Sequence, residues 1–327
     1  RIELTGEAVP IAEDLQFNPA TGRTDFSVSQ NGVLAYRAGG AQDVQLTWAD
    51  RNGRKLETVG EPGFYTQIAL SPDEKRVVVQ RAQSGTSDLW LLELSRGILS
   101  RLSPDAADRR DPVWSPDGRQ IAFRSPRKGN LVLYRITLSG GEEEALLESA
   151  EGKFPEDWSK DGKFLIYDAP NSEKGIWFLP LSGDRKPKLV LETPSKKDEA
   201  QLSPDGRWLA YMSDESGRWE IYVQPYPAPG EKLRLSTNGG GQPRWRKDGR
   251  ELFYLALDGT MMSVPITAGA TLTPGAPKSL FQTGISVAPT ADQFVVAGDG
   301  QRFLLTLPLE SSPPITVVLN WTAALPK

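Results

Sequence analysis

The 327-residue sequence predicts an all-β protein built from repeated four-stranded antiparallel sheets, and three observations support this prediction. First, a ten-residue phrase that reads as strand, tight turn and strand recurs along the chain, as in "WSPDGRQIAF" at residues 114–123. Second, the turn aspartates are separated by 44, 44, 44 and 43 residues: Asp73, Asp117, Asp161, Asp205 and Asp248. Third, the segments between turns are rich in β-branched and aromatic residues and carry no helical apolar period.

Each repeat is long enough for four strands. After the turn hairpin come a run such as "LVLYRITL" and a shorter one such as "EALLES". Four strands of about six residues with four loops of about five fill this period. Weaker copies, with Asn31 and Asp299 in the turn position, raise the number of units to seven. Six units with an irregular extension around residues 268–291 is the alternative.

Sheets that are apolar on both faces need a neighbour on each side, and a closed ring provides one for every sheet. We therefore predict a single domain, residues 1–327, that is a β-propeller of seven (or six) blades. The blades should start near residues 24, 66, 111, 155, 199, 242 and 292. The last unit supplies only three strands, so we expect residues 1–15 to form its outer strand. This N-terminal strand would close the ring on the C-terminal blade.

The repeated aspartate is interpreted as turn chemistry rather than catalysis. In Ser-Pro-Asp-Gly, proline suits the second turn position, aspartate bonds nearby backbone, and glycine accepts a left-handed conformation. A carboxylate repeated five times around a ring has no single substrate to act on. The large residues that close the strand after each turn are interpreted as core between blades: Tyr36, Val79, Phe123, Tyr167, Tyr211 and Tyr254.

The composition excludes several classes of function. With 38 basic and 42 acidic residues the net charge is −4, so nucleic acid is not an expected partner. The chain has neither Cys nor His, which rules out thiolate chemistry and a Ser-His-Asp triad. We therefore predict no catalytic residues, no required cofactor and no enzymatic activity; a propeller hydrolase is a third alternative. No apolar run approaches the ~20 residues that span a bilayer, so the domain itself should not contact membrane.

Propellers bind ligands at the mouth of the central channel, where the chain enters each innermost strand. Four residues before the turn serine, this column reads Asp25, Gln67, Asp111, Pro155, Glu199, Gln242 and Gln293. Asp25, Gln67, Asp111, Glu199 and Gln242 are the candidate ligand-binding residues. Hard oxygen ligands suit Ca²⁺, so a cation or cationic ligand is a candidate occupant, although the metal is not specified. A solvated rim, or a protein-binding rim that includes Arg109 and Asp198, remains open.

The turn phrases resemble TolB-type repeats, the Pro-Asp relatives of WD repeats. The phrases "FSVSQNGVLAY", "LSTNGGGQPRWRKDGRELFYL" and "PITVVLNW" resemble the C-terminal part of bacterial membrane-anchored serine/threonine protein kinases. In those proteins a cytoplasmic kinase domain is followed by a membrane span and a propeller outside. The resemblance covers essentially the whole chain.

The resemblance implies a non-catalytic, extracytoplasmic sensor domain, periplasmic or at the cell surface, tethered by a span in a longer parent protein. The kinase domain itself is not in this chain, because its catalytic loop needs a His-Arg-Asp element and there is no His. The expected partner is a small ligand, an ion or an envelope protein. The alternative is a TolB-like periplasmic scaffold that binds proteins only.

Overall fold

The structure is a computed structural model that describes residues 15, 17–18, 23–24, 26–29, 31–37, 43–83, 86–105, 107–127, 130–169, 175–192, 195–227, 230–269, 271–285, 287, 291–309 and 315–321. The fold class is confirmed: these residues form strands and turns, with antiparallel pairing throughout and no α-helix. Within this part of the chain, no helix has the length and apolarity needed to cross a membrane.

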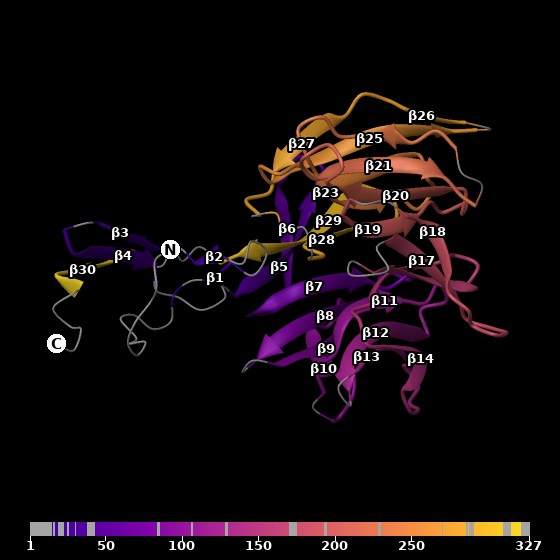
Figure 1. Cartoon of the computed structure of the whole chain (residues 1–327), viewed down its shortest axis with the longest axis horizontal. Coiled ribbons are helices and arrows are strands. Elements are labelled where there is room, and N and C mark those ends of the chain that lie inside the picture. The colour runs from indigo at the N-terminus through magenta and orange to yellow at the C-terminus, as the bar shows by residue number, and fades with distance from the viewer. Residues whose placement is uncertain are drawn as a thin grey trace, which may run out of the picture.

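Five consecutive sheets make up most of a ring (Figure 1), and each is written from its innermost strand outward. Sheet 1 contains β7 (Tyr65–Leu70), β8 (Arg76–Gln83), β9 (Thr86–Glu93) and β10 (Ile98–Arg101). Sheet 2 contains β11 (Arg110–Trp114), β12 (Gln120–Arg127), β13 (Asn130–Thr137) and β14 (Glu144–Ser149). Sheet 3 contains β15 (Phe154–Trp158), β16 (Phe164–Ala169), β17 (Gly175–Pro180) and β18 (Lys188–Leu191).

The next two sheets continue the pattern. Sheet 4 contains β19 (Lys197–Leu202), β20 (Trp208–Ser213), β21 (Glu220–Pro225) and β22 (Leu233–Arg234). Sheet 5 has five strands, β23 (Gly241–Trp245), β24 (Glu251–Leu255), β25 (Thr260–Ala268), β26 (Leu272–Pro274) and β27 (Lys278–Gln282). Both β26 and β27 pair with β25, on its edge away from β24.

Sheet 6 closes the ring with strands from both ends of the sequence. Its order is β28 (Phe294–Val296), β29 (Arg302–Pro308), β5 (Val44–Asp50) and β6 (Lys55–Gly63). The pairing of β29 with β5 runs from Arg302 opposite Asp50 to Pro308 opposite Val44. Innermost β28 contacts β7 of sheet 1 and β23 of sheet 5, so the circle is complete.

Six apolar clusters hold the ring together, and each lies between two neighbouring sheets. In β12, Ile121 and Phe123 pack toward sheet 1, whereas Ala122 between them packs toward sheet 3. Alternation therefore buries both faces of a sheet. The predicted core column is confirmed within the ring, where five of its members are buried: Val79, Phe123, Tyr167, Tyr211 and Tyr254. The prediction is wrong for Tyr36, which lies outside the six ring sheets and is only half-buried.

The repeated turns have the geometry that their residues predict. In the Ser115–Asp117 turn, the serine hydroxyl donates to Asp117 Oδ1 at 2.6 Å, and the same carboxylate oxygen accepts from Arg119 N at 3.0 Å. Gly118, the next residue, has a φ of 68°. The serine–aspartate bond recurs in three other turns at 2.6 to 2.7 Å. We call the end of the ring that carries these turns the turn face, and the opposite end the rim face.

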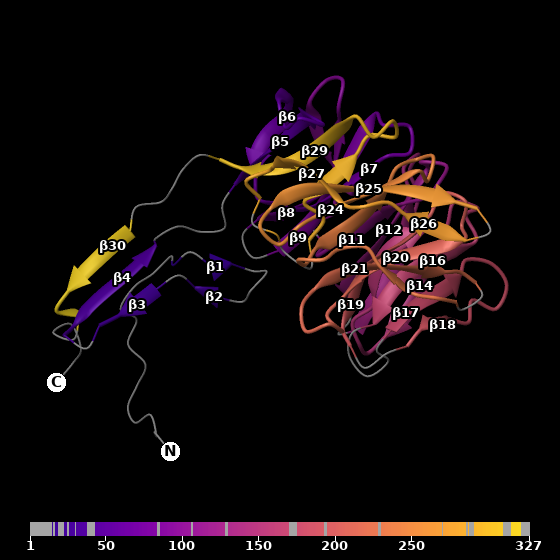
Figure 2. The same ribbon diagram turned by 90° about the horizontal axis from the view of Figure 1, so that it is seen from above.

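The hairpin expected to start the ring lies outside it. β3 (Phe26–Val28) and β4 (Val33–Arg37) pair with β30 (Ile315–Leu319) in a three-stranded sheet that stands apart from the ring in both views (Figures 1 and 2). The ring therefore has six sheets, the lower of the two numbers predicted, and the three-stranded sheet is the seventh unit. The difference arises because β5 pairs with β29 instead of β4. The short β1 (Phe17–Asn18) and β2 (Arg23–Thr24) pair with each other.

The three-stranded sheet exposes apolar side chains on both faces. Phe26 is 58% exposed on one face, and Ile315 and Leu319 are 61% and 70% exposed on the other. Such a surface is unusual for an isolated soluble sheet. Of residues 1–15, expected as the closing strand, residues 1–14 lie outside the described residues; the closure seen here is made by β5 and β6.

A chain that ends at Pro308 should keep the stability of the ring, because it loses β30 but none of the six ring sheets. We expect the melting temperature to change by less than about 2 °C, the shift that follows from a fraction of a kcal/mol in a domain of this size. A chain that ends at Gln301 also loses β29 and should not fold. A large fall for the Pro308 chain, measured by thermal unfolding, would mean that the three-stranded sheet supports the ring.

Candidate functional site

The innermost strands bring the predicted column together at the rim face. The six strands β7, β11, β15, β19, β23 and β28 neighbour one another around the centre of the ring. Their column residues are Gln67, Asp111, Pro155, Glu199, Gln242 and Gln293. Asp25, the seventh predicted position, lies outside the described residues.

Backbone irregularities fix three of these residues. At Asp111, Glu199 and Gln242 the strand pairing shifts register, and φ is 56°, 56° and 58°. A bulge adds an unpaired residue and re-aims its side chain, and left-handed backbone is uncommon for residues other than glycine. The same conformation at three equivalent positions indicates that the surrounding contacts impose it.

Asp111 joins sheets 1 and 2. Its Oδ1 accepts a hydrogen bond from Gln67 Nε2 at 2.6 Å, and its other oxygen forms an ion pair with Arg124. Its backbone N–H donates to Gln80 Oε1 at 2.9 Å. Burial raises the pKa of Asp111, and the Arg124 guanidinium opposes this shift.

A second group joins sheets 4, 5 and 6. Arg244 Nη2 donates to Glu199 Oε2 at 2.9 Å and also forms an ion pair with Asp292. Gln242 Nε2 donates to Gln293 Oε1 at 2.9 Å, and Gln293 N donates back to Gln242 Oε1 at 2.8 Å. Burial raises the pKa of Glu199, with Arg244 opposing the shift. The rim side chains are thus held by neighbouring sheets.

Three carboxyl groups meet beside this rim, between sheets 3 and 4. Glu156 stands in the bulge of β15, Asp168 on β16, and Asp198 near the start of β19. Each offers one oxygen, and these oxygens lie within 4.8 Å of one another. Oxygen ligands at such spacing suit a hard cation such as Ca²⁺.

Burial and mutual repulsion change how this cluster titrates. Burial raises the pKa of Asp168 to about 7, although the Ala169 N–H, Lys197 and Lys153 oppose the shift. The pKa of Glu156 and that of Asp198 are raised well above their usual range by burial first and by the neighbouring carboxylates second. Glu156 and Asp198 hydrogen-bond to each other, so a shared proton can replace a cation there.

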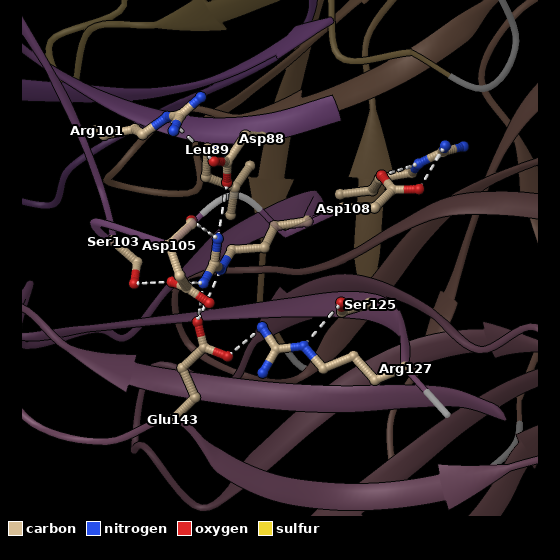
Figure 3. Close-up of polar contacts among 11 residues, drawn as sticks. Asp88, Leu89, Arg101, Ser103, Asp105, Asp108, Ser125, Arg127 and Glu143 are labelled. Atoms are coloured by element: carbon tan, nitrogen blue, oxygen red, sulfur yellow. Dashed lines mark hydrogen bonds and ion pairs between the residues drawn. The ribbon is translucent and has the colours of Figure 1, made fainter. Parts of the chain in front are cut away.

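A buried arginine fixes the loop that leads into β11. The side chain of Arg109 is fully buried and donates to Asp88 at 3.0 Å, Asp105 at 2.6 Å and Glu143 at 2.7 Å. Figure 3 shows these three carboxylates converging from separate segments, with Arg127 forming an ion pair with Glu143. Asp88 belongs to sheet 1, whereas Arg127 belongs to sheet 2, so the network ties the two sheets together.

The comparisons with known proteins agree with this architecture. Residues 26–179 match the TolB beta propeller domain family. This TolB-type match covers the three-stranded sheet's hairpin, β5, β6 and the ring as far as β17. No curated protein sequence matches the chain.

Solved TolB structures are similar in fold. A TolB of Agrobacterium tumefaciens has a TM-score of 0.63 and 17% identity over 83% of this chain and 100% of that chain. TolB from Acinetobacter baumannii has a TM-score of 0.55 and 17% identity over 84% of this chain and 65% of that chain. Kuenenia stuttgartiensis hydrazine synthase has a TM-score of 0.53 and 15% identity, over 98% of this chain and 99% of that one. At these identities the likeness shows the fold alone.

The structure thus groups Gln67, Asp111, Glu199 and Gln242 at one end of the channel. The two carboxylates among them face arginines, so their charge is already matched within the protein. The carboxyl cluster was not predicted as a unit. Its only sequence signal was that Glu156 and Asp198 stand next to column positions.

Replacing Arg109 with Met should destabilise the domain by about 1.5–3 kcal/mol, because Asp88 and Glu143 lose hydrogen bonds from a buried guanidinium and keep only the more exposed Arg101 and Arg127 as cations. Urea unfolding measures this loss. Arg110→Met is the matched control, since Arg110 pairs with Asp108 alone and keeps 37% of its side chain exposed. Equal losses of stability in the two variants would show that the buried Arg109 network does not stabilise the packing of sheet 1 on sheet 2.

The domain should lose stability as pH rises from 5 to 7. Unfolded aspartate titrates near pH 4, whereas the pKa of Asp168 is about 7 in the folded protein. In this window the folded state binds more protons than the unfolded state, so the free energy of unfolding falls with rising pH. Glu156 and Asp198 add in the same direction. Urea unfolding at several pH values between 5 and 7 measures this change in the free energy of unfolding.

Asp168→Asn should reduce this slope, because the asparagine does not titrate. Asp117→Asn is the control, since the pKa of that exposed turn carboxyl is lowered and it has finished titrating by pH 5. A wild-type stability that is flat or rising between pH 5 and 7 would contradict the assignment.

Proposed function

We propose that this chain is a non-catalytic, TolB-like protein-interaction scaffold that holds its partner at the rim face. The observation that carries the proposal is the set of rim side chains fixed by bonds between sheets, above all Asp111, Glu199 and Gln242. A surface whose side chains are already ordered loses little entropy on binding. The TolB-type family match supports the same function.

The carboxyl cluster beside the rim favours a basic partner, because a nearby cation stabilises the ionised form of each carboxyl group. The three carboxyls Glu156, Asp168 and Asp198 lie beside the ring of column residues, and among the described residues Lys153 and Lys197 are the cations that act on Asp168. A lysine- or arginine-bearing segment of a partner protein would complete this group. Ca²⁺ is a second candidate occupant, favoured by the spacing of the same three oxygens.

The partner is proposed to be an envelope protein, and the domain to lie outside the cytoplasm. A second candidate role is that of sensor domain of a membrane-anchored serine/threonine kinase. It is supported by the phrases at residues 26–36, 235–255 and 314–321. In both roles the rim face would do the binding. Kinase activity of a full-length parent, measured with and without a rim-face ligand, separates them.

A peptide of five Lys-Gly repeats should bind the purified domain, and Asp198→Asn should weaken binding at least tenfold by removing one carboxylate of the cluster. Titration calorimetry at about 0.15 M salt measures both affinities. Asp161→Asn is the control, because Asp161 is a turn-face carboxylate far along the strand from the rim. Added CaCl₂ should compete with the peptide if Ca²⁺ uses the same oxygens. Equal binding by the two variants would contradict the proposal that the carboxyl cluster beside the rim binds the basic partner.

A further inference from the structure

A pocket of about 330 Å³ opens on the turn face between sheets 4 and 5. Asp205, Arg207 and Trp208 of sheet 4 line one side. Trp245, Asp248 and Arg250 of sheet 5 line the other, and the end of β25 at residues 266–268 forms the third wall. This volume is at the lower end of the range for small-molecule sites. The pocket lies at the opposite end of the ring from the rim, so it is independent of the proposed function.

In two other crevices of the ring, an arginine guanidinium fills the space between neighbouring sheets. Between sheets 1 and 2, Arg76 stands three residues after the turn aspartate. Its guanidinium lies 5.1 Å from the Trp114 ring and donates to Gly118 O of the next turn at 3.1 Å. The crevice there is closed by the protein's own side chain.

Between sheets 5 and 6, the arginine that fills the crevice comes from a different segment of the chain. Arg51 lies 5.4 Å from the Phe253 ring and donates to Gly300 O at 2.9 Å. It also forms an ion pair with Glu251 at 2.7 Å. Two crevices of the ring are thus closed in the same chemical way.

Between sheets 4 and 5, no guanidinium of the described residues fills the crevice in this way. The position of Arg76 is taken by Trp208, which is 7% exposed and packs into the core between the sheets. Arg207 reaches past the crevice and donates to Gly269 O at 2.9 Å. Gly269 follows β25, which extends beyond the turn face to pair with β26 and so builds the third wall.

The lining charges favour an anion. Asp205 accepts from Arg207 Nε at 2.8 Å, and Asp248 accepts from Arg246 Nε at 2.7 Å, so both carboxylates already have a cation. Arg250 is exposed, and its guanidinium has no hydrogen bond or ion pair among the described residues. Its backbone N–H donates to Asp248, and its backbone carbonyl accepts from Ile266 N. A ligand carboxylate at Arg250 would therefore meet an unmatched guanidinium.

The rest of the lining favours an apolar body on that carboxylate. Trp245 is half-buried, and Ile266 is an apolar residue of the third wall. The Trp208 indole also lines the pocket, and its Nε1 is buried without a hydrogen-bond partner among the described residues. We propose that this pocket binds an organic carboxylate with an aromatic or branched apolar group, either a free acid or the C-terminal residue of a peptide.

The probes that test this are N-acetyl-phenylalanine and the peptide Ala-Ala-Ala-Phe, each with a free carboxylate and as the carboxamide. Calorimetric titration of the whole domain should show saturable binding of the carboxylates, and binding at least tenfold weaker for the amides, a difference of about 1.4 kcal/mol. Binding of both carboxylates assigns the site to small acids as well. Binding of the peptide alone assigns it to protein C-termini. Either result supports the proposal.

Arg250→Gln should weaken carboxylate binding at least tenfold without changing the melting temperature, because this side chain is exposed. Arg119→Gln is the matched control, since Arg119 occupies the same turn position in sheet 2, two residues after Asp117. Ala268→Phe should block the pocket sterically. Three results would overturn the proposal: no saturable binding of either carboxylate, amides that bind equally well, or equal losses in the Arg119 and Arg250 variants.

Discussion

Burial of each sheet between two neighbours is the interaction on which the rest of this molecule depends. Ile121 and Phe123 face one neighbour while Ala122 faces the other, so no sheet can cover its apolar surface alone. Only a closed circle gives every sheet two partners. Closure rests on one pairing, β29 with β5, which brings residues 302–308 against residues 44–50. Every other sheet of the ring is built from consecutive strands, so this pairing is the one non-local step.

Closure also explains why the rim can be ordered before any partner arrives. Once neighbouring innermost strands are fixed, side chains can bridge them, as Gln67 does to Asp111 and Gln242 to Gln293. These bridges hold residues in left-handed backbone that they would rarely adopt alone. The same neighbourhood brings Glu156 and Asp198 together from two sheets. Packing in the ring and the chemistry of the rim are therefore consequences of one geometry.

Much of this was readable in the sequence, because turn spacing reports strand count directly. Counting back from the start of each turn placed Gln67, Asp111, Glu199 and Gln242 correctly on innermost strands, because each of these strands ends directly before its turn. The arginines that neutralise the rim carboxylates could not be foreseen: Arg124 comes from the second strand of its own sheet, and Arg244 from the neighbouring sheet. The pairing partner of β5 could not be foreseen from the sequence either, because a strand that alternates apolar residues can pair with β4 or with β29 equally well.

The closing pair has a consequence for how the chain folds during synthesis. The β5–β6 hairpin is made early, but its partner β29 follows some 250 residues later in the sequence. Until then β5 presents an unpaired edge, and sheet 1 lacks a neighbour on one side. Long-range pairing of this kind slows folding, and open strand edges invite association between unfinished chains. The first strands of the ring to be synthesised are thus the last to complete their sheet. A cell that makes this protein must keep unfinished chains from associating with one another until β29 has been synthesised.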